Sequence, residues 1–167
     1  MRRWMCLFLL TSTLSLGQGL DRGHVELAAL LGGSLDTSSV FNRGKAAFGG
    51  QVAVGVNRRW AATFNYVAAK HDQGVCLFLC PPPDRTLHEV MGGVRFSMLN
   101  EGRVTPYLSG TVGGVRSTYS SFATGIGAGL NVRATKRFGL LVDLRGIYAV
   151  SPQTWIVRGT GGFYVRF

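Results

Sequence analysis

Apolar and polar side chains alternate with a period of two residues along eight separate stretches of this sequence. In 138–148, Leu140 and Val142 fall on one face, while Asp143 and Arg145 fall on the other. Such a period places successive side chains on opposite faces of a β-strand. None of the residues assigned to the apolar faces is charged. The pattern therefore predicts an all-β chain whose strands separate an apolar medium from a polar one.

Polar breaks divide the chain into these stretches. The short breaks lie at 57–59, 100–103 and 135–137, and their Asn, Gly and Thr residues are typical of turns. The other connections are longer, at roughly 34–45, 71–85, 116–121 and 149–153. Alternating short and long connections are typical of an up-and-down barrel. We therefore predict an all-β, eight-stranded antiparallel up-and-down transmembrane β-barrel, with strands at 24–33, 46–57, 60–70, 87–98, 104–115, 122–133, 138–148 and 154–167.

The hydrophobic residues are abundant but dispersed. They make up 46% of the 167 residues. After the first twenty residues, no stretch approaches the ~18 to 20 apolar residues that a membrane-spanning helix needs, whereas a tilted spanning strand needs only about 9 to 11. With 24 Gly and 5 Pro in no regular period, the composition excludes collagen-like and Pro-rich chains. We expect one barrel domain.

The first nineteen residues have the layout of an export signal. Met1-Arg2-Arg3 is a positive segment, Trp4 to Leu16 is apolar, and Gly17-Gln18-Gly19 supplies small residues for cleavage. We predict a signal peptide at 1–19 and the barrel domain at 20–167.

The chain is basic, with a formal net charge of +10, which becomes +8 when Arg2 and Arg3 are removed. No stripe of Lys and Arg with interleaved aromatic residues is evident, and an exported chain rarely meets nucleic acid. We therefore expect no nucleic-acid partner.

Aromatic residues are predicted to form two girdles at the ends of the strands. With a periplasmic N-terminus, one girdle lies at the periplasmic end and the other at the outer end. Such rings are expected at both boundaries of a barrel in a membrane. The periplasmic girdle comprises Trp60, Phe96, Phe138 and Phe167, and the outer one comprises Phe48, Phe122, Tyr148 and Trp155.

The predicted polar face carries the charged residues of the strands. Because isolated buried charges are costly, we expect these residues to form a paired network inside the barrel. Inward glycines, among them Gly129 and Gly139, are expected to make room for long neighbours such as Tyr107 and Tyr164. The predicted network comprises Glu26, Glu89, Arg95, Arg133, Asp143, Arg145, Arg158 and Arg166.

Two short motifs carry a resemblance to a known family. The chain ends in Thr160-x-Gly162-x-x-Val165-x-Phe167, and an earlier stretch reads Arg103-Val104-Thr105-Pro106-Tyr107-Leu108. In these motifs the chain resembles the small eight-stranded outer-membrane barrels, the group of the outer membrane protein A transmembrane domain and the opacity-type surface proteins. The first motif resembles that family's C-terminal insertion signal, formed here by Thr160, Gly162, Val165 and Phe167.

The resemblance implies a location and partners. It implies the bacterial outer membrane with a periplasmic N-terminus, contact with outer-membrane lipid, and recognition by the barrel-assembly machinery during insertion. It implies no cofactor. No peptidoglycan-binding domain follows Phe167, so attachment to the cell wall is not expected.

Cys76 and Cys80 belong to the predicted second outer loop. An exported location favours a disulfide between them; a metal-binding or reactive-thiol role is the alternative, although no His stands at ligand spacing. The residues between them, Leu77-Phe78-Leu79, form an apolar tip. This tip either folds over the barrel mouth or contacts a surface partner.

Three functions remain open for a membrane barrel, and a soluble ligand-binding barrel is a further alternative. The first is a structural or surface-interaction role through the outer loops, without catalysis. The second is a small anion-leaning pore, because five inward arginines exceed three inward carboxylates. The third is a lipid-A-modifying enzyme, for which His88 and Glu89 would supply an acid-base pair. We assign no catalytic, cofactor or metal residues.

Overall fold

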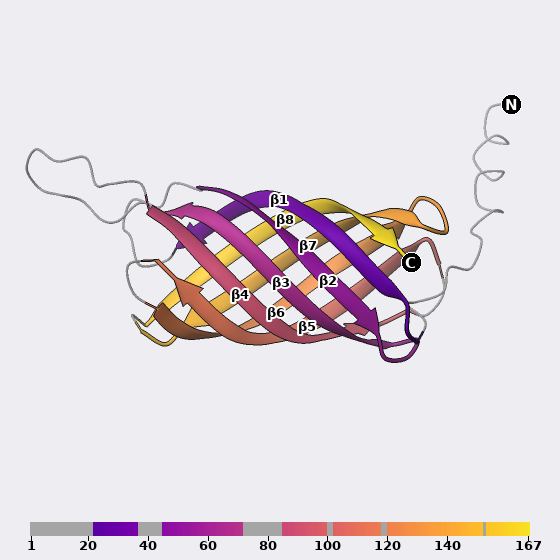
Figure 1. The fold of residues 1–167 in the computed structure, drawn as a ribbon, viewed down its shortest axis with the longest axis horizontal. Helices are drawn as coiled ribbons and strands as arrows, with labels where there is room; N and C mark the ends of the chain where they lie inside the picture. The colour runs from indigo at the N-terminus through magenta and orange to yellow at the C-terminus, as the bar shows by residue number, and fades with distance from the viewer. Residues whose placement is uncertain (1–21, 37–44, 72–84, 100–101, 118–119, 152) are drawn as a thin grey trace, which may run out of the picture.

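The chain forms a closed eight-stranded β-barrel (Figure 1). The computed structural model describes residues 22–36, 45–71, 85–99, 102–117, 120–151 and 153–167. The predicted signal peptide and the Cys76–Cys80 pair lie outside these residues. The strands are β1 (Val25–Asp36), β2 (Lys45–Gly55), β3 (Trp60–His71), β4 (Arg85–Ser97), β5 (Val104–Arg116), β6 (Ser120–Arg133), β7 (Phe138–Ala149) and β8 (Thr154–Arg166).

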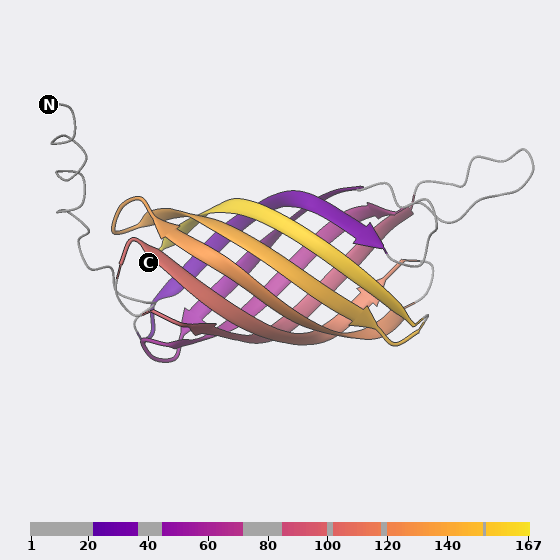
Figure 2. The same cartoon turned by 180° about the vertical axis from the view of Figure 1, so that it is seen from behind.

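Each strand pairs antiparallel with the next one along the chain, and β8 pairs with β1 to close the barrel (Figures 1 and 2). At this seam, the Phe167 amide donates to the Val25 carbonyl at 2.9 Å, and the Val25 amide donates back at 3.2 Å. The predicted fold, an eight-stranded antiparallel up-and-down barrel, is confirmed. Closure also leaves no strand edge with unpaired backbone groups.

The three predicted short turns join β2 to β3, β4 to β5 and β6 to β7. The Asn57 Oδ1 atom accepts hydrogen bonds from the amides of Arg59 and Trp60, both at 2.9 Å. The Thr135 Oγ1 atom accepts in the same way from the amides of Arg137 and Phe138, at 3.2 and 3.0 Å. These side chains replace the ladder partners that the backbone loses where the chain reverses. We call this end of the barrel the short-turn end.

Several strands extend further than predicted at the opposite end. β1 continues three residues past position 33, because Ser34 pairs with Arg158 of β8 and Asp36 pairs with Ile156. The Gly32-Gly33-Ser34 sequence is typical of a turn. Here the ladder to β8 overrides that local preference.

The strands alternate between a buried and an exposed face. In β7, every second residue from Gly139 to Ala149 is buried inside the barrel, while Leu140, Val142 and Leu144 are exposed outside. Within the described ranges, no helix is long and apolar enough to span a membrane.

Candidate functional site

Most of the described charged side chains of the strands lie inside the barrel, in two groups. The first is centred on Glu26 of β1, which is 2% exposed. Its carboxylate accepts hydrogen bonds from Arg95 Nη1 at 2.9 Å, from Arg166 Nη2 at 3.1 Å and from Asn131 Nδ2 at 3.2 Å. One carboxylate therefore serves two guanidinium groups, and this arrangement joins β1, β4, β6 and β8 across the interior.

The second group consists of two one-to-one ion pairs. Arg158 Nη1 donates to Glu89 Oε2, and Arg145 Nη2 donates to Asp143 Oδ2 at 3.2 Å. The Tyr107 hydroxyl also donates to Asp143 Oδ2, at 2.8 Å. All four charged side chains are buried, so each ion is paired with an opposite charge inside the barrel.

Two tyrosines fill the space beside these ions. Tyr107 lies over Gly129, its partner on β6, and Tyr164 lies over Gly139, its partner on β7. A Cβ atom at either glycine would overlap the tyrosine ring. The guanidinium groups of Arg95 and Arg166 stand over the rings of Tyr107 and Tyr164, at 5.3 and 5.7 Å from the ring centroids. The structure thus places at Gly129 and Gly139 the room that the sequence predicted for these tyrosines.

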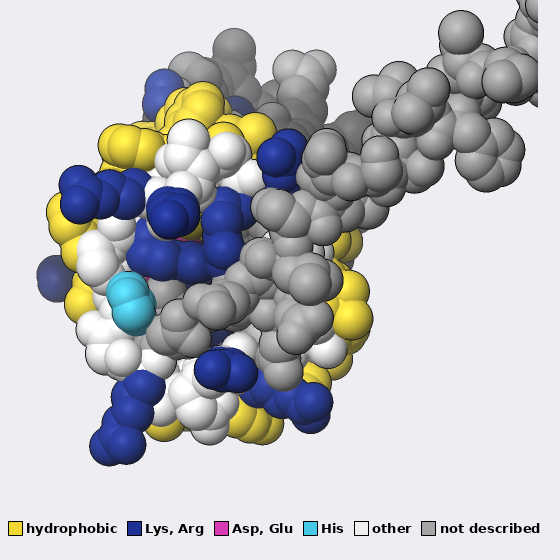
Figure 3. All heavy atoms as spheres, turned by 90° about the vertical axis from the view of Figure 1, so that its right-hand side faces the viewer, with side chains coloured by type: hydrophobic (Ala, Val, Ile, Leu, Met, Phe, Trp, Pro, Cys, Tyr) yellow, Lys and Arg dark blue, Asp and Glu magenta, His cyan; other side chains and the backbone are white. Residues whose placement is uncertain are grey.

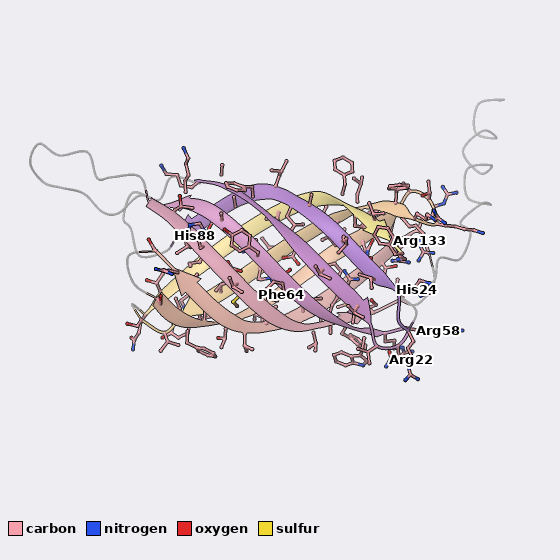
Figure 4. The ribbon with its side chains drawn as sticks, in the orientation of Figure 1. Arg22, His24, Arg58, Phe64, His88 and Arg133 are labelled. Carbon is pink, nitrogen blue, oxygen red and sulfur yellow. The ribbon has the colours of Figure 1, made fainter. Side chains whose placement is uncertain are left out.

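The structure places the predicted charged residues as follows. Seven of the eight form the contacts above; the remaining one, Arg133, is half-buried near the short-turn end (Figure 4) and also has an interaction partner. The charges are unevenly distributed, because the second group is balanced whereas Glu26 faces two arginines. The positive excess of the interior therefore lies toward the short-turn end.

The outer surface is apolar on all eight strands, with exposed residues such as Leu27, Phe64, Val94, Leu144 and Phe163. Figure 4 shows Phe64 near mid-barrel, between the two ends. A charged side chain in such a position would cost about 2 to 4 kcal/mol in a membrane. The outer surface is therefore suited to hydrocarbon.

The predicted girdle residues lie toward the strand ends. Trp60 packs on Phe96 with ring centroids 4.9 Å apart at the short-turn end, and Tyr148 packs on Trp155 at 5.2 Å at the other end. The remaining girdle residues are all exposed: Phe48, Phe122, Phe138 and Phe167.

The hypothesis that His88 and Glu89 form an acid-base pair is wrong. As neighbours on β4, they point to opposite faces: His88 is exposed outside, whereas Glu89 is buried and bonded to Arg158. His88 Nδ1 is instead 2.8 Å from the Tyr66 hydroxyl, and the two rings stack at 6.1 Å. Among the described residues, no group of three or more His, Cys, Asp and Glu side chains could hold a metal ion.

One feature of the site was missed in the sequence. Figure 3 looks onto the short-turn end, where Lys and Arg side chains gather around and within the barrel mouth. Each short turn contributes at least one Lys or Arg residue, and Arg22 adds another basic residue before β1. The signal was present, but it emerges only when the three turns are considered together, because they are far apart in sequence.

No protein-family model matches the chain, and no curated protein is similar to it in sequence. Solved structures do share its fold. Neisserial surface protein A superimposes with a TM-score of 0.67 at 13% identity, over 86% of this chain and 96% of that one. Ail, the attachment invasion locus protein of Yersinia pestis, superimposes with a TM-score of 0.60 at 13% identity, over 87% of this chain and 99% of that one. The N-terminal β-barrel domain of OprF from Pseudomonas aeruginosa superimposes with a TM-score of 0.60 at 17% identity, over 87% of this chain and 98% of that one.

The fold is that of the small outer-membrane barrels. The resemblance predicted from the terminal motif and the Pro106-Tyr107 strand is thereby confirmed at the level of architecture. At these identities the likeness carries no ligand or activity to this chain.

Proposed function

We propose that this protein is an integral outer-membrane barrel with a structural or surface-interaction role, exerted through the connections opposite the short-turn end. The observation that carries the proposal is the apolar outer surface of a closed barrel, on which the exposed strand charges with described side chains, Lys70 and Arg116, lie only at strand ends. Soluble monomers rarely expose a contiguous apolar patch larger than a few hundred Å². A surface of this kind on every strand supports a lipid environment.

The neighbours support the surface part of the proposal in a limited way. Ail is named for attachment and invasion, and it has also been solved with the heparin analogue sucrose octasulfate. A barrel of this size can therefore present a binding surface in a relative of the same fold. For the present chain, the outer connections would supply that surface, with the apolar Leu77-Phe78-Leu79 tip as a candidate contact.

A small pore is the second candidate, favoured by the arginine excess inside the barrel. Large buried side chains occupy the interior, including Met91, Tyr107, Leu141, Arg158 and Tyr164. Eight strands leave an interior just wide enough for side chains. The packing therefore favours the structural role over conduction.

Planar-bilayer recording with the purified full chain separates these two candidates. The structural role predicts no reproducible conductance steps. Reproducible anion-selective steps, with an anion preference that Arg133→Gln reduces, would establish the pore instead.

Epitope labelling on intact cells tests the surface role. An epitope inserted after Gly74, in the β3–β4 connection, should bind antibody on unbroken cells. The matched epitope inserted after Thr135, in the β6–β7 turn, should bind only after the outer membrane is permeabilised. The reverse pattern would contradict both the periplasmic N-terminus and the surface role.

A further inference from the structure

The short-turn end carries a ring of exposed Lys and Arg side chains, here called bases, and we call this ring the basic rim. Its members are Arg22, Arg58, Arg59, Arg103, Lys136 and Arg137, all exposed. They come from the segment before β1 and from all three short turns, so they surround the barrel instead of forming one patch (Figures 3 and 4).

The interior reinforces the charge of the rim. Arg133 and Arg166 are half-buried at the same end, and Glu26 is shared between Arg166 and Arg95. The three carboxylates whose side chains are described, Glu26, Glu89 and Asp143, are all buried inside the barrel. None of these three carboxylates lies on the outside at the rim, where Arg58 and Arg59 each have an interaction partner.

Among the described side chains, the short-turn end has more bases than the opposite end. At the opposite end these are Lys45, Lys70 and Arg116; Asp36, Arg43, Asp72, Asp84 and Arg85, which belong in sequence to that end, lie outside the described side chains. Asp21 and Glu101, which lie outside the described residues, belong in sequence to the short-turn end. Even when both are set against the rim, its six bases remain in excess.

The rim lies directly beside the edge of the apolar belt. Arg59 precedes the girdle residue Trp60, and Arg137 precedes Phe138. Where aromatic girdles mark the boundary between hydrocarbon and water, the headgroup layer begins at the same level. The rim bases are thus placed at the depth of the lipid phosphates.

We propose that the basic rim binds the phosphodiester headgroups of anionic phospholipids in the leaflet that surrounds the short-turn end. A guanidinium group matches a phosphate with two parallel hydrogen bonds, and bases beside an anionic bilayer attract its lipids. A nucleic acid or an acidic protein would be bound best by Lys and Arg residues gathered on one continuous face of this protein. The basic rim instead surrounds the barrel, so lipids on all sides of the barrel can contact one of its residues. This inference rests on the proposed membrane location.

Two tryptophans allow the lipid preference to be measured separately at each end. Trp60 is 44% exposed in the girdle beside the rim, and Trp155 is 50% exposed at the far end. The full chain with Trp4→Phe and Trp155→Phe reports only on the rim, and the chain with Trp4→Phe and Trp60→Phe reports only on the far end. Each is folded into phosphatidylcholine vesicles that contain either brominated phosphatidylglycerol or brominated phosphatidylcholine, and quenching of the tryptophan is compared.

Trp60 should be quenched preferentially by brominated phosphatidylglycerol, with a relative association of about fivefold, the effect of one base near an anionic surface. The preference should fall toward one in the Arg58→Gln, Arg59→Gln, Arg103→Gln triple variant and at high salt. The matched Arg58→Lys, Arg59→Lys, Arg103→Lys variant, which keeps the positive charge, should retain the preference for the anionic lipid. The Lys70→Gln, Arg116→Gln variant, which changes the opposite end, should leave the quenching of Trp60 unchanged. In the same way, the Arg58→Gln, Arg59→Gln, Arg103→Gln variant should leave the quenching of Trp155 unchanged.

The outcomes separate this inference from the proposed function. An inserted barrel whose Trp60 shows no preference for the anionic lipid overturns the inference and leaves the membrane location intact. A preference that survives the triple Gln change also overturns it. If the triple Gln variant keeps its lipid preference but no longer retains a short DNA duplex, the partner is a macromolecular polyanion and the lipid assignment falls. Failure of the unaltered chain to insert into either lipid contradicts the proposed function itself.

Discussion

At the residue scale, Glu26 links distant parts of the chain. It accepts hydrogen bonds from Arg95, Asn131 and Arg166, which lie on three other strands. Removing one partner of a buried ion pair is costlier than the pair itself is stabilising, because the remaining charge stays buried without compensation. Two arginines depend on this one carboxylate.

Glu26→Gln should therefore destabilise the folded barrel by at least about 3 kcal/mol. Urea unfolding in phospholipid vesicles, followed by heat-modifiable gel mobility, measures the loss. Lys136→Gln, in an exposed turn, serves as the control and should change stability by less than about 0.5 kcal/mol. Equal stability of the two variants would show that the Glu26 pairs contribute little.

Gly139 lies under the ring of Tyr164, where an added Cβ atom would overlap the ring. Gly139→Ala should destabilise the barrel by about 1 to 3 kcal/mol through overpacking. Gly92→Ala is the matched control, since a Cβ atom there meets nothing within 4 Å. In a double-mutant cycle, Tyr164→Ala should remove most of the cost of Gly139→Ala; simple additivity of the two changes would contradict the packing described here.

At the scale of the element, each strand has one face for lipid and one for the interior. Leu144, 60% exposed, lies near the middle of β7, whereas Val104 is the first residue of β5. Leu144→Arg should cost about 2 to 4 kcal/mol of folding stability in vesicles, and Val104→Arg only about 0 to 1 kcal/mol, because the cost falls toward the interface. Equal costs at the two depths would contradict the assignment of the belt to hydrocarbon.

The final strand supplies a separate prediction about assembly. Phe167 is 68% exposed, and its backbone closes the seam with Val25. Since the side chain is outside and the seam uses only the backbone, Phe167→Asp should reduce the level of inserted protein in cells much more than it alters refolding into vesicles. Phe167→Trp is the control. Normal levels of the Asp variant in the outer membrane would remove Phe167 from the predicted assembly signal.

The strands could be predicted because each segment carries its own period of two and its own turn signals. The strand β7 was predicted to within one residue at 138–148. The ends of β1 and β4 could not, because pairing with neighbouring strands extends them beyond their local signals. The alternation on β4 already separates His88 from Glu89, so the acid-base hypothesis conflicted with the strand that contains both residues.

At the scale of the whole molecule, closure brings together residues that the sequence keeps far apart. Glu26 and Arg166 are separated by 140 positions and lie on adjacent strands. The sequence placed the charged residues on the interior face, but it could not say which arginine meets which carboxylate. That pairing depends on the register of all eight strands at once. The basic rim was missed for the same reason, since it exists only after the three short turns meet at one end.

The proposed function requires that this chain is a closed barrel whose apolar outer surface is embedded in a membrane. Fractionation of cells that express the full chain, followed by gels of the membrane fraction with and without boiling, tests this claim. The protein should be found in the outer-membrane fraction, and the unboiled sample should migrate at a different apparent mass from the boiled one, since a closed barrel resists detergent. Recovery of folded protein in the soluble fraction, in buffer without detergent, would contradict the claim.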